Sequence, residues 1–240
     1  MRWVVFRSSE EMIGGAADAF ARRAAEACAD RGSCLIALSG GATPQPLYRL
    51  LANPREPWFG RIPWKKMHVL WADERCVPPD HEQSNYRAAY DTMLHRVPIP
   101  TENVHRIRGE APPGDAGVEY EQQLRSLAAL RGDRNRLPID LAILGVGLDG
   151  HTASLFPNHP ALLEDRRWIR DVTVPARPPR RITLTFPLLN QANHVLFLAA
   201  GRTKREILER IRNGEDLPAA RIAPAQGEVT WYVDSEATNA

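Results

Sequence analysis

Asp149 and His151 are the two residues of this chain best suited by type and spacing to acid–base chemistry. They follow the apolar run Ile139–Leu144 and lie in a glycine-rich segment. An aspartate two positions from a histidine can fix the tautomer of the imidazole and leave a competent base near neutral pH. His151 is the only one of the seven histidines flanked in this way. We therefore expect His151 and Asp149 to be the catalytic residues.

The glycines at positions 145, 147 and 150 match the G-x-G-x-x-G spacing of dinucleotide-binding turns. Such a turn opens a long helix, whereas Pro157 and Pro160 interrupt the chain within ten residues of it. The motif also begins more than halfway along the chain, although it usually opens a domain. We therefore do not expect an NAD-dependent dehydrogenase.

A second segment has the composition of a phosphate-binding loop. It lies between the apolar run Cys34–Leu38 and the helix-like segment Gln45–Asn53, and it contains Ser39, Gly40, Gly41 and Thr43. Glycines let a ligand approach the backbone closely, and free N–H groups at the start of a helix attract phosphate. The alternative is an ordinary strand–helix turn, but capping a helix needs one hydroxyl and no Gly-Gly pair. We favour the phosphate-binding loop.

Charged side chains follow two further apolar runs. Asp73, Glu74 and Arg75 follow the run His68–Trp71 after one alanine, and alone they are better explained as a local ion-pair cluster than as a site. Lys204 lies in the first turn of a predicted helix, where a cation opposes the helix dipole unless an anion is bound nearby. Because the chain has only three lysines among its 31 basic residues, we interpret Lys204 as a phosphate ligand.

The elements that must position these residues alternate between strand-like and helix-like segments. The apolar runs of strand length are Trp3–Phe6, Cys34–Leu38, His68–Trp71, Ile139–Leu144, Ile169–Val174, Ile182–Phe186, Val195–Ala199 and Val229–Val233. The segments with helical period are Ser8–Arg31, Gln45–Asn53, Ser84–Arg96, Ala116–Arg131 and Thr203–Asn213. Strands separated by helices predict right-handed crossovers and a mostly parallel sheet. We expect one Rossmann-like α/β domain over residues 1–240, with three layers and helices on both faces of the sheet.

Composition excludes several classes of protein. With 43% hydrophobic and 25% charged residues among 240, the chain has the composition of a globular protein. A net charge of +2 is too balanced for electrostatic binding of nucleic acid or a membrane surface. The three cysteines, Cys28, Cys34 and Cys76, lack C-x-x-C spacing, which favours a reducing compartment. No apolar run reaches the length of a membrane span, so we expect a soluble cytoplasmic protein, either a monomer or a weak homo-oligomer.

Six blocks between residues 38 and 204 resemble the 6-phosphogluconolactonase family, in the family's order. They are Ser39–Pro44, Ala72–Arg75, Ser84–Tyr86, Gly145–Pro157, Arg181–Thr185 and Gly201–Lys204. The block Gly145–Pro157 is the most specific, whereas the serine-glycine loop is shared with the sister family of glucosamine-6-phosphate deaminases. Deaminases typically carry Ala-Phe-Asn-Glu-Pro after Gly-His and a tyrosine after Asp-Glu. Here those positions hold Thr152–Pro157 and Arg75, which favours the lactonase.

The resemblance implies hydrolysis of 6-phospho-D-glucono-1,5-lactone, the second step of the oxidative pentose phosphate route. His151 would then take a proton from the attacking water, and Asp149 would orient its ring. The residues implied to bind the substrate phosphate are Ser39, Gly40, Gly41, Thr43, Arg75, Arg181 and Lys204. Asp73 and Asn85 are candidate contacts to the rest of the substrate.

Two alternatives stay open beside the lactonase. A deaminase or related sugar-phosphate isomerase would abstract a proton from a sugar carbon and, in the deaminase, release ammonia. A non-catalytic sugar-phosphate sensor would keep the phosphate ligands but could dispense with Asp149 and His151. A lactone carbonyl is already electrophilic, and no clustered metal-ligand spacing is present, so we expect neither a metal nor a cofactor.

Overall fold

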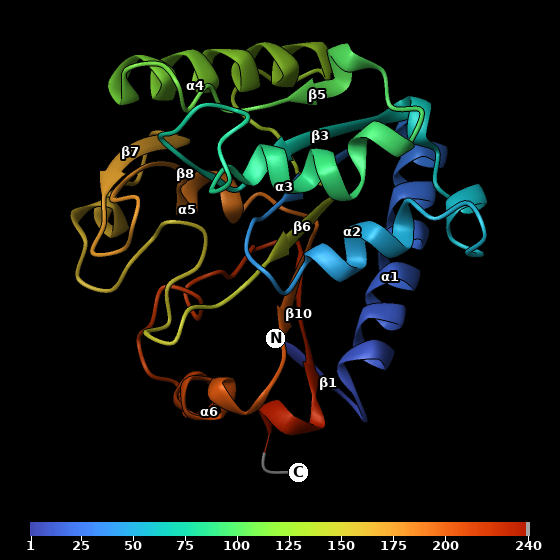
Figure 1. Ribbon diagram of the computed structural model, residues 1–240. Helices are drawn as coiled ribbons and strands as arrows, with labels where there is room; N and C mark the ends of the chain where they lie inside the picture. The colour runs from blue at the N-terminus through green and yellow to red at the C-terminus, as the bar shows by residue number, and fades with distance from the viewer. Residues whose placement is uncertain (239–240) are drawn as a thin grey trace.

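A parallel sheet of seven strands runs through the middle of the molecule (Figure 1). The structure, a computed structural model, describes residues 1–238. The strands of this sheet are β1 (Arg2–Phe6), β2 (Cys34–Leu38), β3 (Met67–Trp71), β5 (Val104–His105), β6 (Leu141–Leu144), β9 (His194–Ala199) and β10 (Glu228–Asp234). They lie in the order β1-β10-β9-β6-β2-β3-β5. β2 and β6 are buried along their whole length, because helices or loops cover both of their faces.

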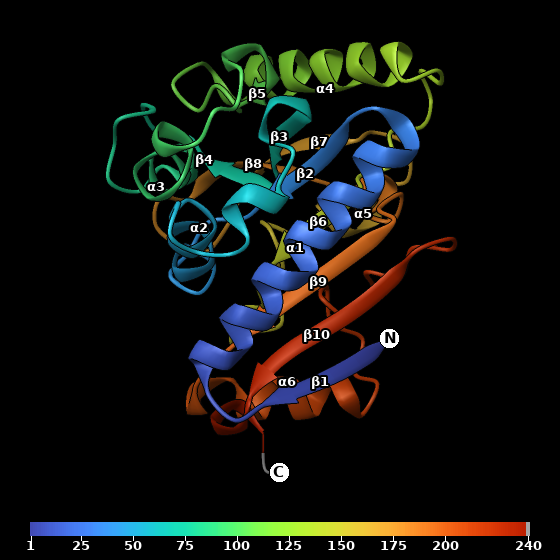
Figure 2. The same ribbon diagram turned by 90° about the vertical axis from the view of Figure 1, so that its right-hand side faces the viewer.

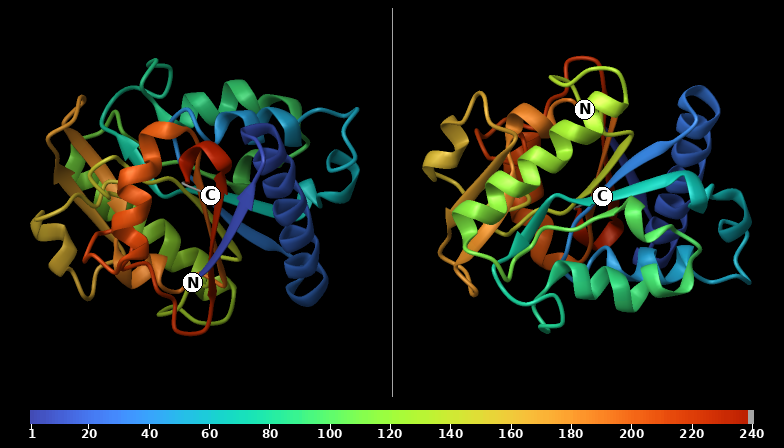
Figure 3. Two further views of the ribbon diagram at one scale, coloured as in Figure 1. Left: turned by 90° about the horizontal axis from the view of Figure 1, so that it is seen from below. Right: turned by 90° about the horizontal axis from the view of Figure 1, so that it is seen from above.

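Helices lie on both sides of this sheet. They are α1 (Ser9–Arg31), α2 (Gln45–Leu51), α3 (Asn85–Thr92), α4 (Pro113–Leu130), α5 (Phe186–Leu189) and α6 (Arg205–Arg212). Figure 2 shows α1 in front of the sheet, running alongside β9 and β10, and Figure 3 shows α1 and α6 on opposite sides of the strands. This arrangement confirms the predicted three-layer α/β domain with helices on both faces.

The longest helix, α1, begins and ends where its sequence predicts. The side chain of Ser8 accepts a hydrogen bond of 3.2 Å from the backbone N–H of Glu11, which caps the helix. Gly32 ends the helix with φ +78, a left-handed conformation that glycine adopts without strain. Ala16 and Ala17 on its buried face are fully covered, so the helix can lie close to the sheet.

A second, antiparallel sheet of three strands was not expected from the sequence. It has the order β4-β8-β7, with β4 at Asp73–Arg75, β8 at Arg180–Leu184 and β7 at Ile169–Thr173. The two longer strands, β7 and β8, correspond to predicted apolar runs, whereas β4 does not, because its three charged residues give no apolar alternation. α4 packs over β7 and β8, and the backbone N–H of Leu184 donates to the carbonyl of Ala72 at 2.8 Å. This sheet therefore carries Asp73 and Arg75 as a continuation of β3.

The amino ends of the central strands are held together around one buried carboxylate. Asp140, just before β6, accepts hydrogen bonds from Arg31 at 2.7 Å, Arg131 at 3.1 Å and the backbone N–H of Leu35 at 2.8 Å. The side-chain amide of Asn193 donates to it as well, at 3.1 Å. A buried charge is tolerated when its hydrogen bonds are satisfied in this way. The opposite, carboxyl end of the sheet is left for ligands.

Within the described part of the chain, no helix has both the length and the apolar character needed to cross a bilayer.

Candidate active site

A cavity of ≈ 370 Å³ lies at the carboxyl ends of the central strands and brings distant segments together. Ten of the eleven predicted site residues line it, all except Asp149: His151 and the group Ser39, Gly40, Gly41, Thr43, Asp73, Arg75, Asn85, Arg181 and Lys204. His151 lines the same cavity, together with Gly145 and Gly147 from its own loop. A larger hollow of ≈ 590 Å³ along α4 contains none of the predicted residues. We therefore take the smaller cavity as the candidate site, because the predicted residues meet there and not in the larger hollow.

The predicted catalytic pair is in direct contact. His151 Nδ1 lies 2.6 Å from Asp149 Oδ1, and the backbone N–H of His151 donates to the same oxygen at 3.1 Å. Partial burial alone would raise the pKa of Asp149, but the hydrogen bonds and charge of His151 outweigh it and hold that pKa below its usual range. The ionised carboxylate assigns the proton to Nδ1, which leaves Nε2 free to accept one. Among the described residues, Nε2 has no hydrogen-bond partner.

Gly147 makes this close pairing sterically feasible. A Cβ atom on Gly147 would lie 2.1 Å from His151 Nδ1 and 2.6 Å from Asp149 Oδ1. The backbone N–H of Gly147 also donates to the carbonyl of His151 at 2.8 Å, which closes the loop. The glycine-rich turn therefore allows the chain to fold back on the acid–base pair, and its spacing resembles a dinucleotide motif without sharing its structure.

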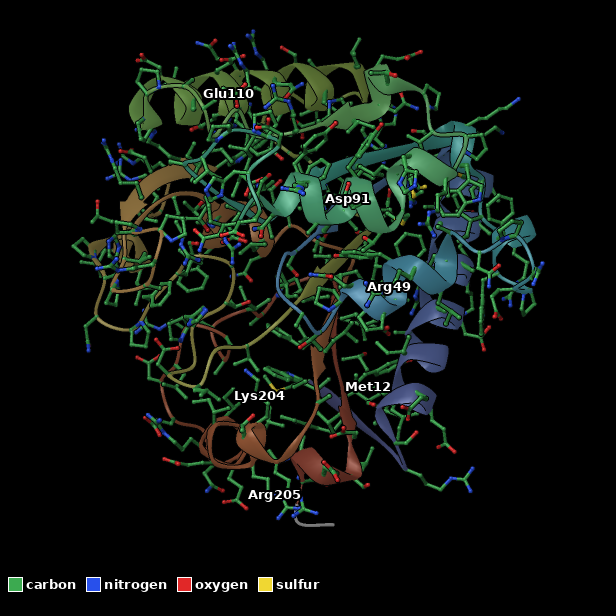
Figure 4. The ribbon with its side chains drawn as sticks, in the orientation of Figure 1. Met12, Arg49, Asp91, Glu110, Lys204 and Arg205 are labelled. Carbon is green, nitrogen blue, oxygen red and sulfur yellow. The ribbon has the colours of Figure 1, made fainter. Side chains whose placement is uncertain are left out.

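Three cationic side chains line the cavity, and within residues 1–238 each has hydrogen-bond donors without a partner. Arg181 is only 6% exposed, and its Nη1 lies 3.9 Å from Asp73 Oδ2. Arg75 has a buried Nε without a partner in the described structure. Lys204 Nζ donates to the carbonyl of Val146 at 2.6 Å, and Figure 4 shows Lys204 beside α6, on the side facing the loop after β6. Burial lowers the pKa of Lys204 and of Arg181 from their ordinary values, so a bound anion would be favourable beside them.

Ser39 lies in the wall of the cavity, but both of its donors are used inside the protein. Its hydroxyl donates to the carbonyl of Ile143 at 2.7 Å, and its backbone N–H donates to the Tyr48 hydroxyl at 3.2 Å. The Tyr48 hydroxyl in turn donates to the carbonyl of Ser39 at 2.8 Å. Ser39 therefore braces the loop, whereas the backbone N–H groups of Gly40 and Gly41 have no partner in the described structure.

Asp73 and Glu74 point in different directions, because successive side chains of a strand alternate between its faces. Glu74 is buried and accepts from the backbone N–H groups of Asn85 at 2.7 Å and Tyr86 at 2.8 Å, so it caps α3. Burial raises the pKa of Glu74, and these hydrogen bonds offset part of that effect. Asp73 lines the cavity and accepts from the Ser154 hydroxyl at 2.6 Å.

Ser154 and Phe156 do not line the cavity, but each contacts a residue that does. Ser154 connects the loop after β6 to Asp73. The ring of Phe156 stacks on the imidazole of His151, with centroids 4.0 Å apart. Both residues stand within the most specific sequence block, where they were treated only as part of the pattern.

No group of three or more His, Cys, Asp or Glu side chains converges within residues 1–238 in a way that could hold a metal ion.

Comparison with known proteins shows which family has this architecture. The fold and cavity are those of an α/β protein with a histidine–aspartate pair and a cluster of cations at the carboxyl ends of parallel strands. The chain belongs to the glucosamine-6-phosphate isomerase/6-phosphogluconolactonase family, whose model matches residues 7–231.

Individual relatives narrow the comparison. The 6-phosphogluconolactonase of Synechocystis is 41% identical over 220 residues, covering 90% of this chain and 88% of that protein. A rice protein named probable 6-phosphogluconolactonase 3, chloroplastic, is 35% identical over 247 residues, covering 98% of this chain and 75% of the relative. The crystal structure of 6-phosphogluconolactonase from Thermotoga maritima superposes with a TM-score of 0.83 at 28% identity, covering 98% of this chain and 99% of that one.

Proposed function

We propose that this chain hydrolyses 6-phospho-D-glucono-1,5-lactone to 6-phospho-D-gluconate, as a step of the oxidative pentose phosphate pathway. The observation that carries the proposal is the contact of 2.6 Å between Asp149 and His151 in a cavity that also holds Arg75, Arg181 and Lys204. The relatives named 6-phosphogluconolactonase, which match nearly the whole chain, support the same reaction.

In the proposed reaction, His151 acts as the general base. Its Nε2 takes a proton from a water molecule, and the water oxygen attacks the lactone carbonyl carbon to form a tetrahedral oxyanion. When the oxyanion collapses, the bond from that carbon to the ring oxygen breaks. The proton held on His151 then passes to the ring oxygen, which becomes a hydroxyl group. Asp149 stabilises the transient imidazolium without itself taking the proton.

The substrate phosphate binds, in this proposal, at the cationic side of the cavity. Its ligands are the backbone of Gly40 and Gly41, the Thr43 hydroxyl, and the side chains of Arg75, Arg181 and Lys204. An arginine can bind a phosphate through two parallel hydrogen bonds, whereas a lysine acts as a point charge. Because α2 has only seven residues, these side chains supply the charge that a long helix dipole would otherwise provide. Ser39 fixes the loop, and Asp73 and Asn85 are candidates for contacts to the sugar.

The decisive measurement is the rate of lactone hydrolysis above the spontaneous background, with and without the 6-phosphate. The phosphate lies far from the reacting carbon, so its binding energy orients that carbon. We expect the phosphorylated lactone to be strongly preferred. A parallel assay of ammonia release from glucosamine 6-phosphate tests the deaminase alternative. Ammonia release without lactone hydrolysis would replace the proposal, and binding without either reaction would favour a sensor.

We expect full hydrolytic activity after exhaustive chelation and without added cofactor. The lactone carbonyl is electrophilic enough for base-assisted attack by water, so a Lewis acid has little to add. The measurement is activity before and after treatment with a chelator. Loss of activity that one divalent metal restores stoichiometrically would make His151 a metal ligand instead of a base. A cytoplasmic location and a monomeric or weakly associated state also remain predictions.

A further inference from the structure

We propose that Phe156 is a positioning residue for the proposed lactone hydrolysis, on which this inference rests. Its ring holds the plane of the His151 imidazole and stabilises the imidazolium formed when Nε2 takes the proton. The two rings are nearly parallel, with an interplanar angle of 15° and centroids 4.0 Å apart. Phe156 is thus in face-to-face contact with the group assigned as the base.

The hydrogen bond to Asp149 cannot by itself fix the imidazole. It anchors one ring nitrogen of His151, and the ring can still tilt about that contact. The carboxylate is also an imperfect anchor, because the Asp149 side chain is 43% exposed. An error of about 1 Å in the position of a reacting group can cost roughly 10²-fold in rate. Because the flat face of Phe156 lies against the imidazole, the His151 ring cannot tilt about its hydrogen bond to Asp149.

Phe156 is itself held firmly. It is 5% exposed and belongs to the hydrophobic core. The tight turn 152–155 precedes it, closed by a backbone hydrogen bond of 2.9 Å, with Ala153 in the left-handed region at φ +48. The hydroxyl of Ser154 anchors this turn to Asp73. The turn therefore brings Phe156 back beneath His151 in one arrangement.

The ring of Phe156 also has the right charge distribution for catalysis. The face of an aromatic ring is partly negative and attracts a cation placed over it. The attraction is greater for the imidazolium than for the neutral imidazole, so it stabilises the state in which His151 carries the proton. The charged side chains that share the cavity are Asp73, Arg75, Arg181 and Lys204, with Asp149 on the same loop as His151. A substitution at Phe156 changes none of these charged side chains, so a change in the pH profile reports the loss of the ring.

The test compares Phe156→Leu with Phe156→Tyr. For Phe156→Leu we expect kcat to fall about tenfold, within the range of a desolvated cation–π contact, while KM stays unchanged. The midpoint of the acidic limb of the pH–kcat profile shifts to lower pH, because the imidazolium has lost stabilisation. Phe156→Tyr keeps the aromatic face and restores both kcat and the profile. A wild-type kcat and profile in Phe156→Leu would overturn the proposal, as would a loss of kcat in Phe156→Tyr equal to that in Phe156→Leu.

A matched control separates positioning from stability. Phe20 is a fully buried phenylalanine in α1 outside the cavity wall, so Phe20→Leu should lower Tm but leave kcat and the pH profile unchanged. If Phe156→Leu does not fold, Phe156→Met removes the ring while keeping an apolar side chain of similar length.

Nuclear magnetic resonance of the unaltered protein tests the geometry independently. The ring current of Phe156 should move the chemical shifts of the His151 ring protons upfield. His151 ring protons at the chemical shifts of an unstacked histidine would overturn the proposal. If the unaltered protein does not hydrolyse the lactone above background, the proposed function fails, and the resonance shift still reports whether the rings stack.

Discussion

At the scale of single residues, the proposed mechanism assigns proton transfer and substrate binding to different side chains. His151 and Asp149, which are in contact, are the proposed acid–base pair. Arg75, Arg181 and Lys204, which line the same cavity, are the proposed phosphate ligands. The two groups should therefore respond differently to substitution.

Replacing His151 with asparagine should remove the base and leave the cavity nearly intact. We expect kcat to fall by about 10²–10⁴-fold, the usual contribution of general-base assistance, with KM little changed because the interaction is made only in the transition state. The measurement is steady-state hydrolysis corrected for the spontaneous rate. In the unaltered protein, activity should also decline at acidic pH, since a protonated imidazole cannot accept the proton. Near-wild-type turnover in His151→Asn would move the role of base elsewhere, with Asp73 the first candidate.

Replacing Lys204 with alanine should mainly weaken binding. Loss of a charged hydrogen bond to the phosphate costs about 1.5–3 kcal/mol, so KM should rise by at least tenfold. Lys66→Ala, which removes an exposed lysine outside the cavity, is the control. Lys204 also donates to the carbonyl of Val146, so Tm is measured alongside. An unchanged KM would remove Lys204 from the phosphate site.

The sequence was informative about residues whose chemistry is unusual in their local context. Asp149, His151 and Lys204 stand out by type and position, and all three lie at or beside the cavity. Ser39 was predicted to donate to the phosphate, but its hydroxyl and its backbone N–H donate to Ile143 and Tyr48 instead. Ile143 is more than one hundred positions away, and Tyr48 lies on the next helix. The local sequence around Ser39 therefore indicates neither contact. Phe156 could not be selected either, because an apolar residue in a loop is indistinguishable from core until its stacking partner is known.

At the scale of elements, the proposed phosphate-binding loop, residues 39–44, packs together with α3 and β4. Asn85, at the start of α3, donates to the carbonyl of Asp73 at 2.9 Å. A Cβ atom on Gly40 would lie 1.7 Å from Asn85 Oδ1, so the loop packs directly against this amide. Glu74 holds the first turn of α3 through two backbone N–H groups. The shape of the loop therefore depends on a helix that begins more than forty residues later.

Replacing Gly40 with alanine tests this coupling. The added methyl group must displace Asn85 or the loop itself, so we expect weaker substrate binding together with a lower Tm. Gly14→Ala is the matched control, because a Cβ atom there meets nothing within 4 Å. Gly14 lies in the interior of α1, where alanine stabilises a helix by about 0.5–1 kcal/mol. If Gly40→Ala binds substrate as the unaltered protein does, the proposed packing is wrong.

Six of the seven strands of the parallel sheet and two of the three antiparallel strands were predictable, whereas the short strands β5 and β4 were not. All eight apolar runs became strands, because length, β-branched residues and flanking turns are local signals. β4 consists of Asp73, Glu74 and Arg75, and its pairing with β8 depends on a partner more than one hundred positions away. No local signal specifies such a pairing.

At the scale of the whole molecule, two stacked histidines, His68 and His105, should make the free energy of unfolding depend on pH. His68 Nδ1 lies 3.0 Å from His105 Nε2, across neighbouring strands β3 and β5. His105 is 8% exposed, and its Nδ1 is buried without a partner in the described structure. Burial lowers the pKa of His105 to about 4 from an ordinary 6.5, and it lowers the pKa of His68 as well. The folded protein therefore holds this pair neutral.

We expect the free energy of unfolding to fall as the pH drops from 6.5 towards 4. In that window the unfolded chain binds a proton at His105 and the folded chain does not, so acid favours unfolding; above 6.5 this contribution is flat. At about 1.4 kcal/mol per pH unit, the loss between pH 7.5 and pH 5 is about 2 kcal/mol. Urea unfolding at the two pH values measures it. His105→Gln should flatten the dependence, whereas His95→Gln, at an exposed site, should retain it; equal slopes in both variants would contradict the assignment.

The pairing of β1 with β10 has a consequence for the order in which the chain assembles. Arg2 lies opposite Thr230, 228 positions later, and Trp3 stacks on Trp231 with ring centroids 4.9 Å apart. At a synthesis rate of about 5–20 residues per second, β1 waits roughly 10–45 s for its partner. In the meantime the strand that carries Trp3 has no partner strand, and the apolar surface of Trp3 stays uncovered by Trp231. The strands β2, β3 and β6, whose following loops line the cavity, lie nearer the centre of the sheet, so they can assemble before this edge is completed.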